Sequence, residues 1–418
     1  MTLPPALVLG PPKFIAPLGV MRSLGRMGVP VYGLAHGNWS MTGMSRYCAG
    51  KVAVGIDGRP LGDPRDLVRQ LLEAARKIGP GAVLIPASDE WALLVAGNAS
   101  NLEEAYTFSR PSHDLVATLA SKDSLTALAA RHGLPAPRTY TPSSRDNVAV
   151  LALQLDYPVI VKPAESRPGM TVKGLATNPD ELLMWFGRIE ESAISPNVCI
   201  QEYIPGGDQA SWLFNAYFDA DGRSVAAFTG TKMRQHPRRL GIACLVQTQH
   251  NPELIDQTVR FLADVGYRGA VDVDYRYDAR DGQYKVVDIN PRLGGAFRAF
   301  VDAAGMDLAR VMYLDLTRRK VGSVTVIDGR RWVKEDSDLV AFRYYRESEG
   351  LTFRSWLRSL RGVGEGGIFA RDDPLPFLVA MVQLLSRTTG AKLKRRGRGL
   401  ARAMSWPARR LKPRQGAA

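Results

Sequence analysis

The sequence predicts a mixed fold, α/β at its N-terminal end and α+β in the rest of the chain. Two observations predict it. Residues 5–35 read as a strand, a helix and a second strand, which is the order that starts a parallel sheet. Segments 211–219 and 269–278 are longer strands followed by short turns, a pattern typical of antiparallel sheets. With 418 residues, the chain is long enough for two or three domains.

The β-α-β start is similar to the opening of a dinucleotide-binding fold, but its glycine fingerprint is missing. Strands are expected at 5–9 and 29–35, with a loop and a helix over 20–28 between them. Two prolines follow Gly10, where G-x-G-x-x-G needs a second glycine for close approach to pyrophosphate. The sequence therefore disfavours NAD binding and an oxidoreductase.

Further elements follow from capping and periodicity. The segment 82–90 reads as a strand that ends in Asp89 and Glu90, which either contact substrate or begin a helix. We favour the helix start. Ser121 or Asp123 is expected to cap a helix that Gly133 stops. Additional helices are predicted at 66–78, 179–192 and 253–265, and additional strands at 157–162, 197–204, 224–233 and 284–290.

Cysteine usage and hydropathy indicate a reduced, cytoplasmic protein. Cys48, Cys199 and Cys244 are scattered and odd in number, without C-x-x-C spacing. The N-terminal residues lack a basic segment followed by a long apolar one, so no signal peptide is expected. No run of 18 apolar residues occurs, so no membrane-spanning helix is expected either.

The net charge of +14 is concentrated at the C-terminus. Residues 391–418 hold ten Lys or Arg and no acid, which leaves 45 basic against 41 acidic groups in the other 390 residues. A near-neutral body disfavours nucleic-acid binding, and the tail is expected to be a solvated, partly disordered extension. Its alternative role is contact with an anionic membrane or RNA. The apolar segment 374–386 before it is expected to be a buried core helix, with an interfacial helix as the alternative.

The stretch KVVDINPRLGG, residues 285–295, carries the first chemical signal. Asp288, Asn290 and Arg292 recur at every second position, so a strand would place them on one face. Carboxylate and amide oxygens are hard ligands suited to Mg²⁺, and the planar guanidinium fits phosphate or carboxylate. This face therefore suits a divalent cation that carries a phosphate chain.

The order of several such motifs resembles the ATP-grasp superfamily. The motifs are Lys122 on a helix, V-I-V-K-P with Lys162, a glycine-bearing loop, Q-E-Y-I-P-G-G-D, V-D-V-D-Y and D-I-N-P-R. Each motif is weak alone, but their order and spacing over about residues 5–320 are specific. Within the superfamily, the chain is most similar to carboxylate–amine ligases related to D-alanine–D-alanine ligase and D-aspartate ligase.

The resemblance implies how the chain is divided. It implies a Rossmann-like pre-ATP-grasp domain followed by a two-subdomain ATP-grasp fold that clamps ATP. The boundaries we expect are 1–112 for the Rossmann-like domain, 113–200 for the small subdomain with its flap loop, 201–320 for the catalytic subdomain, 321–390 for a C-terminal extension and 391–418 for the basic tail.

The resemblance also implies which residues bind nucleotide. Lys122 and Lys162 match the lysines on the phosphate and adenine sides, where a point charge suits a triphosphate. Lys122 alone would read as a solvated helix residue, whereas a lysine that ends an apolar strand needs an anionic partner. The loop 165–174 matches the flap. The adenine hinge is implied at Gln201, Glu202, Tyr203 and Ile204, and Asp208 stands where the family has a ribose-binding Glu.

The implied metal ligands are Asp274, Asp288 and Asn290, with Asp where many relatives have Glu. Two Mg²⁺ ions are implied, for which Mn²⁺ could substitute. Asp272, two residues before Asp274 on the same strand face, is an alternative ligand. Exposed edge carboxylates are the competing interpretation, which the adjoining Asp288 and Asn290 weaken.

The implied catalytic residues are Arg292, Lys232 and Arg234, which would neutralise the transferring phosphoryl group or the acyl phosphate. A basic surface strand is the competing interpretation of Lys232 and Arg234. The S-R-Y segment 45–47 either contacts substrate or packs the first domain, and we favour packing. His236 and His250 are expected to be structural.

Taken together, the resemblance implies an ATP-dependent ligase that joins a small carboxylate to an amine and releases ADP and phosphate. Relatives often dimerise, so a homodimer is an additional expectation. Two alternatives stay open besides the oxidoreductase: another ATP-grasp reaction such as carboxylation, and a non-catalytic ATP-binding module that its basic tail docks to membrane or RNA.

Overall fold

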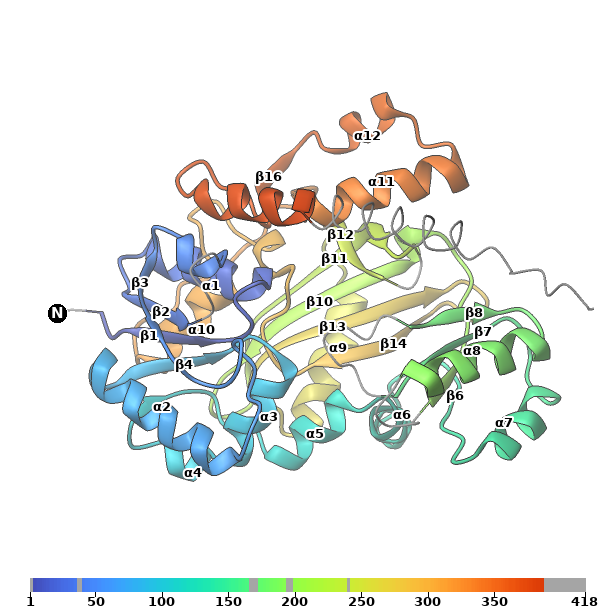
Figure 1. The fold of residues 1–418 in the computed structure, drawn as a ribbon, viewed down its shortest axis with the longest axis horizontal. Coiled ribbons are helices and arrows are strands. Elements are labelled where there is room, and N and C mark those ends of the chain that lie inside the picture. Colours follow the sequence, from blue (N-terminus) through green and yellow to red (C-terminus); the bar gives the residue numbers. More distant parts are fainter. Residues whose placement is uncertain (1–2, 36–39, 165–171, 193–197, 239–240, 387–418) are drawn as a thin grey trace, which may run out of the picture.

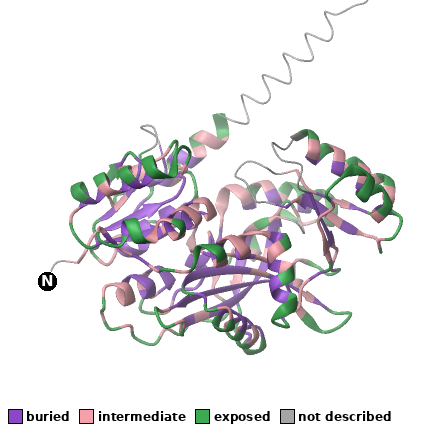
Figure 2. Ribbon diagram, turned by 90° about the horizontal axis from the view of Figure 1, so that it is seen from below, coloured by how far each residue is buried: buried purple, intermediate pink, exposed green. Residues whose placement is uncertain are grey.

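The computed structural model describes residues 3–35, 40–164, 172–192, 198–238 and 241–386. These residues form three β-sheets with helices packed on them (Figure 1). Most strands of the sheets are buried, whereas the outer faces of the covering helices are exposed (Figure 2). The mixed α/β and α+β fold is confirmed.

The N-terminal sheet is parallel, with strand order β3-β2-β1-β4-β5. All four residues of β1 are buried, as expected for a strand covered on both faces. Helix α1 begins at Ile15, inside the segment that we expected to be a loop. Pro17 does not prevent this, because the amide groups of the first helical turn need no partner within the helix. The elements are β1 Ala6–Leu9, α1 Ile15–Gly25, β2 Val31–Leu34, β3 Cys48–Val52, α2 Pro64–Ile78, β4 Ala82–Pro86, α3 Asp89–Gly97, α4 Ala99–Leu102 and β5 Tyr106–Thr107.

A four-stranded antiparallel sheet of order β6-β9-β7-β8, called the small sheet below, lies in the segment that we predicted to be the small subdomain. Val159, Val161 and Ile200 on its strands pack against Leu182 and Phe186 of a covering helix. Its elements are β6 Thr139–Tyr140, α7 Arg145–Ala152, β7 Val159–Pro163, β8 Gly174–Ala176, α8 Pro179–Ser192 and β9 Val198–Glu202.

A seven-stranded sheet of order β14-β13-β10-β11-β12-β15-β16 contains the strands of the predicted catalytic subdomain, and we call it the catalytic sheet for that reason. Its strands are β10 Ser211–Phe218, β11 Ser224–His236, β12 Ile242–Thr248, β13 Gly269–Asp278, β14 Gln283–Asn290, β15 Arg331–Val333 and β16 Val363–Gly366. The helices after β5 that accompany it are α5 His113–Ala120, α6 Lys122–Arg131, α9 Pro252–Asp264 and α10 Leu308–Leu316. Leu119 and Leu125 of α5 and α6 share a core with Val273 of this sheet. The helix pair thus packs on the catalytic sheet, although we assigned it to the small subdomain.

The expected C-terminal extension is built into the rest of the molecule. Strands β15 and β16 extend the catalytic sheet, and helix α11 Glu335–Glu349 packs on β11 and β12. Helix α12 Phe353–Ser359 follows it. The division into domains stays a prediction, because the boundaries at 200 and 320 both fall where contacts cross.

The segment 375–386 is helical, but it is not the buried core helix that we expected. One face packs on α1, where Ala380 and Phe377 contact Leu18 and its neighbours, whereas the other face is exposed. In Figure 1 it is the red helix above α1. In the part of the chain that the structure describes, no helix is long and apolar enough to cross a membrane.

Buried polar contacts join the N-terminal domain to residues 372 and 373. The Arg22 Nε donates to the Asp373 carboxylate at 2.9 Å, and both side chains are almost fully buried. Ser45 and Tyr47 donate hydroxyl hydrogen bonds to Asp373 and Asp372 at 2.7 and 2.6 Å. The S-R-Y segment therefore has the packing role that we favoured.

Candidate active site

A cavity of about 290 Å³ lies between the small sheet and the catalytic sheet. These sheets lie side by side in Figure 1, with β7 and β8 next to β13 and β14. Charged residues of both signs line it: Lys122, Lys162, Lys173, Lys232, Arg276, Glu202, Asp274 and Asp288. Charged groups that converge on a cavity between two sheets are typical of a ligand site rather than of a packing defect.

The acidic side of the cavity comes from the β13–β14 hairpin. Asp274 pairs in register with Asp288, and Asp272 pairs with Asn290, so two neighbouring rungs bring all four side chains together. A lysine meets each carboxylate of the first rung. The Lys232 Nζ lies 2.7 Å from Asp274 and the Lys122 Nζ lies 3.1 Å from Asp288.

The ion pair between Lys122 and Asp288 keeps both partners charged. Burial alone would raise the pKa of Asp288, but Lys122 and Lys162 outweigh it and lower that pKa below its ordinary value. Burial likewise opposes the charge of Lys122, and Asp288 outweighs it, so the pKa of Lys122 is raised. Burial, reinforced by the charge of Asp274, raises the pKa of Asp272 to about 6.

Lys162 is a buried cation with an uncharged hydrogen-bond partner. Its Nζ is buried and donates to the neutral side-chain oxygen of Gln201 at 2.8 Å. Burial lowers its pKa to about 8. A buried ammonium group whose partner is an uncharged amide favours the binding of an anion in the adjoining cavity. This is expected of a lysine that binds phosphate.

Three cationic or amide side chains that the sequence analysis did not single out also line the cavity: Lys173, Gln235 and Arg276. Burial and the nearby Lys232 lower the pKa of Lys173, which lies near the end of the flap loop 165–174. Gln235 lies on β11, and Arg276 on β13 donates to the carbonyl oxygens of Ile204 and Gly206, both at 2.6 Å. Lys173 stands within the loop 165–174, and Arg276 comes two residues after Asp274 in the predicted strand 269–278, so both carried a signal.

The hinge residues are only partly aimed at the cavity. Gln201, Glu202 and Ile204 line it, whereas Arg276 occupies the carbonyl of Ile204 and its guanidinium lies over the ring of Tyr203. Asp208 does not line the cavity but hydrogen-bonds Gln235, which does. It accepts from Gln235 at 3.2 Å and from the Tyr345 hydroxyl of α11 at 2.5 Å.

Arg234 does not lie in the cavity with Lys232. The β11–β12 register shifts between Lys232 and Arg234, and a bulge of this kind reverses the alternation of the side chains. Gln235 therefore lines the cavity, and Arg234 points to α11, where it donates to Asp338 at 2.7 and 3.1 Å. The predicted catalytic pair is split, and Arg234 has a structural partner.

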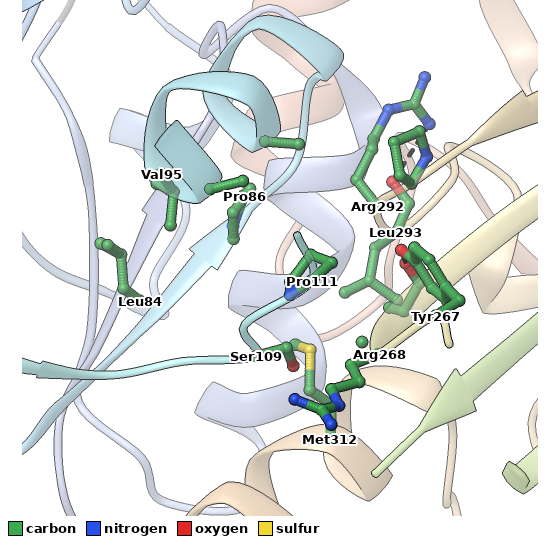
Figure 3. Close-up of a pocket in the computed structure, with 15 residues that line it drawn as sticks. Leu84, Pro86, Val95, Ser109, Pro111, Tyr267, Arg268, Arg292, Leu293 and Met312 are labelled. Carbon is green, nitrogen blue, oxygen red and sulfur yellow. Dashed lines mark hydrogen bonds between the residues drawn. The ribbon is translucent and has the colours of Figure 1, made fainter. Parts of the chain in front are cut away.

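Arg292 also lies outside this cavity, at the junction with the N-terminal domain. It donates to Asp89 at 2.9 Å and to the Asn290 Oδ1 at 3.1 Å. Asp89 is in the first turn of α3, whose cap is Ser88, so the helix start we favoured is confirmed. Figure 3 shows Arg292 beside Leu293 at a small second cavity, of about 40 Å³, between β4–α3 and the catalytic sheet.

The oxygen donors of the cavity fit Mg²⁺ only together with the phosphates of a substrate. Among the described residues, no group of three or more His, Cys, Asp or Glu could hold a metal ion by itself. Mg²⁺ usually binds through one or two carboxylates and the phosphates of a substrate, which is what Asp274, Asp288 and the lysine-lined cavity offer together. The flap residues 165–171 lie outside the described part of the chain.

The fold is that of ATP-grasp proteins, and comparison with known proteins agrees. Residues 231–314 match the family model described as the carbamoyl-phosphate synthase L chain, ATP-binding domain. The biotin carboxylase domain of Hydrogenobacter thermophilus 2-oxoglutarate carboxylase superposes with a TM-score of 0.61 at 13% identity, covering 79% of this chain and 74% of that one. An L-amino acid ligase from Bacillus licheniformis superposes with a TM-score of 0.58 at 14% identity, covering 79% and 78%.

More particularly, the sequence is similar to that of a D-aspartate ligase. The relative from Enterococcus faecium (strain Aus0004) is 27% identical over 247 residues. These residues are 56% of this chain and 58% of the relative, so the match spans less than two thirds of the relative's length. The resemblance predicted from the motifs, to ATP-grasp proteins and to D-aspartate ligase in particular, is confirmed.

Proposed function

We propose that the protein is an ATP-dependent carboxylate–amine ligase that forms an amide and releases ADP and phosphate. The observation that carries the proposal is the mixed charge of one cavity: Asp274 and Asp288 on a hairpin face Lys122, Lys162 and Lys232. This arrangement suits a polyphosphate and its cation. The similarity to D-aspartate ligase supports the ligation of a carboxylate to an amine as the reaction.

The reaction has two steps. A carboxylate oxygen of the first substrate attacks the γ-phosphorus of ATP, and ADP leaves. The amine then attacks the acyl carbon, the phosphate leaves, and the amine loses a proton. The first step makes a good leaving group from a poor one, and positioning and charge neutralisation dominate its catalysis.

The residues have distinct roles in this proposal. Asp274, Asp288 and Asn290 would hold Mg²⁺, which would supply positive charge to offset that of the phosphates. Lys122 and Lys232 exchange their carboxylate partners for phosphate oxygens as the nucleotide enters, and Lys162 gains its anion. Arg292 neutralises the acyl phosphate. Gln201 to Ile204 contact adenine, Asp208 contacts the ribose, and Arg234 has no part because Asp338 holds it.

Carboxylation is the second candidate, because a structural neighbour is a biotin carboxylase domain crystallised with magnesium-ADP and bicarbonate. It would use the same nucleotide residues but a bicarbonate in place of the organic acid. Homodimer formation, Mn²⁺ substitution and the number of metal ions also stay proposals.

The test is an ATPase and hydroxamate assay. Purified protein is incubated with Mg-ATP, hydroxylamine and pools of amino acids and small carboxylic acids, and ADP, AMP and hydroxamate are measured. Ligation predicts hydroxamate with ADP in a ratio near one, lost in Asp288→Ala. ADP formation that depends on bicarbonate and yields no hydroxamate would favour carboxylation. AMP in place of ADP would contradict both.

A further inference from the structure

The helix at 375–386 carries an exposed apolar stripe. Leu375, Leu378, Val382 and Leu385 are 48, 55, 67 and 64% exposed. Their spacing of three, four and three residues places them on one face. The helix has no charged side chain in its twelve residues, so nothing on it interrupts this face.

The opposite face fixes the orientation of the stripe. Ala380 is buried with Leu18 of α1, Met41 and Ile368, while Phe377 and Met381 pack on the same cluster. Phe377 also meets Phe369 edge to face, with ring centroids 5.5 Å apart. The helix is thus anchored to the body by one face, and the stripe lies on the face that points away from this anchor.

The sequence beyond the helix indicates what covers the stripe. Residues 387–418 contain eleven Lys or Arg and no acidic residue. An exposed apolar face followed directly by a polybasic segment has the two components that bind anionic lipid: apolar insertion and attraction to headgroups. A protein partner would need its own acidic and apolar surface in this order, whereas an anionic bilayer presents both everywhere.

We propose that the helix 375–386 lies on an anionic phospholipid surface, with Leu375, Leu378, Val382 and Leu385 inserted between headgroups, and that the positive charge of the sequence after it strengthens this binding. The protein would bind this surface peripherally, since the stripe is one face of a helix of twelve residues. This proposal is independent of the ligase activity, because vesicle binding is measured without turnover.

The test is co-sedimentation of the full chain with vesicles. Phosphatidylcholine vesicles are compared with vesicles that also contain phosphatidylglycerol, at about 0.1 and about 0.5 M NaCl. The variant Val382→Asp/Leu385→Asp removes the stripe, and Lys392→Gln/Lys394→Gln/Arg395→Gln/Arg396→Gln reduces the charge. Leu153→Asp is the matched control, because Leu153 is 82% exposed on a different part of the surface.

The expected result is binding to the anionic vesicles only, weaker at high salt, reduced at least about tenfold by either multiple variant and unchanged by Leu153→Asp. Binding that survives the stripe variant would overturn the proposal in favour of the basic tail alone. Failure of the wild-type chain to bind, with a dimer that the stripe variant dissociates in light scattering, would overturn it in favour of a second copy. Unchanged melting of the variants confirms that each is folded.

Discussion

The guanidinium group of Arg292 donates to the carboxylate of Asp89 across the junction between the N-terminal domain and the catalytic sheet, with 2.9 Å between Nε and Oδ1. The two residues are 203 positions apart in the sequence. The same guanidinium donates to Asn290, the proposed metal ligand, at 3.1 Å. The N-terminal domain therefore orients an arginine that the proposed reaction uses.

Replacing Asp89 tests this connection. Asp89→Asn should lower kcat at least about tenfold with little change in the affinity for ADP, because Arg292 loses the charged partner that orients it. Steady-state kinetics and ADP binding by calorimetry measure the two effects. Glu90→Gln is the control, since Glu90 neighbours Asp89 and hydrogen-bonds Ser88 instead. Equal losses in both variants would mean that the helix start, and not the pair with Arg292, matters.

Lys232 and Arg234 should respond in opposite ways to the same substitution. Lys232→Met should lower turnover by about 10²–10³-fold with an unchanged melting temperature, because the cavity loses a cation at the phosphates. Arg234→Met leaves Asp338 buried without its cation and should cost about 3–5 kcal/mol of unfolding free energy. Urea unfolding and an ADP assay on both variants check this. A stable, inactive Arg234→Met would restore that residue to the site.

The contrast shows how far the sequence carries. Motif order and strand alternation predicted the hairpin with Asp274 and Asp288 and the lysines that face it, because period-2 patterns fix which face a side chain occupies. The same rule predicted Arg234 on the same face as Lys232. That prediction is wrong because a bulge lies between the two residues, and the local sequence does not indicate a bulge.

Other misses have a similar physical cause. The helix pair 113–131 and the strands β15 and β16 pack on the catalytic sheet through contacts between distant segments, which periodicity does not encode. The apolar run 375–386 indicated burial by composition, although only its docking on α1 decides which face is covered. Tyr345 contacts Asp208 from a position whose local sequence pattern is ordinary.

The buried pair Arg22–Asp373 should matter for stability and not for chemistry. Both side chains are 2% exposed, and Ser45 also donates to the same carboxylate. Asp373→Ala should lower the free energy of unfolding by about 3–5 kcal/mol, because it leaves a buried guanidinium uncompensated. Denaturant unfolding measures it, with the exposed Asp156→Ala as the control. A loss below about 1 kcal/mol, as for a surface pair, would contradict the buried role.

Lys162 should give the nucleotide affinity a pH dependence. Its pKa, lowered by burial to about 8, means that the ammonium of the free enzyme is charged below pH 8 and loses its proton above it. The value of kcat/KM for ATP should therefore fall as the pH rises through about 8. In Lys162→Arg the guanidinium stays charged, so this inflection should disappear. An inflection that persists in the variant would assign it to another group.

Tyr345 should influence recognition of the ribose through Asp208. Its hydroxyl donates to Asp208 at 2.5 Å, and Gln235 donates to the other carboxylate oxygen at 3.2 Å, so α11 of the C-terminal extension orients the residue proposed to bind ribose. Burial and this contact raise the pKa of Tyr345, which keeps it a donor at neutral pH. Tyr345→Phe should raise KM for ATP about three- to tenfold with kcat nearly unchanged, the effect of one lost hydrogen bond.

The decisive readout for Tyr345 is the ratio of the KM values for ATP and 2′-deoxy-ATP. If Asp208 binds the ribose hydroxyls, Asp208→Asn and Tyr345→Phe should both bring this ratio toward one, and the double variant should add little to either. A ratio that stays the same in Tyr345→Phe, with KM raised for both nucleotides alike, would limit Tyr345 to packing α11 on β11.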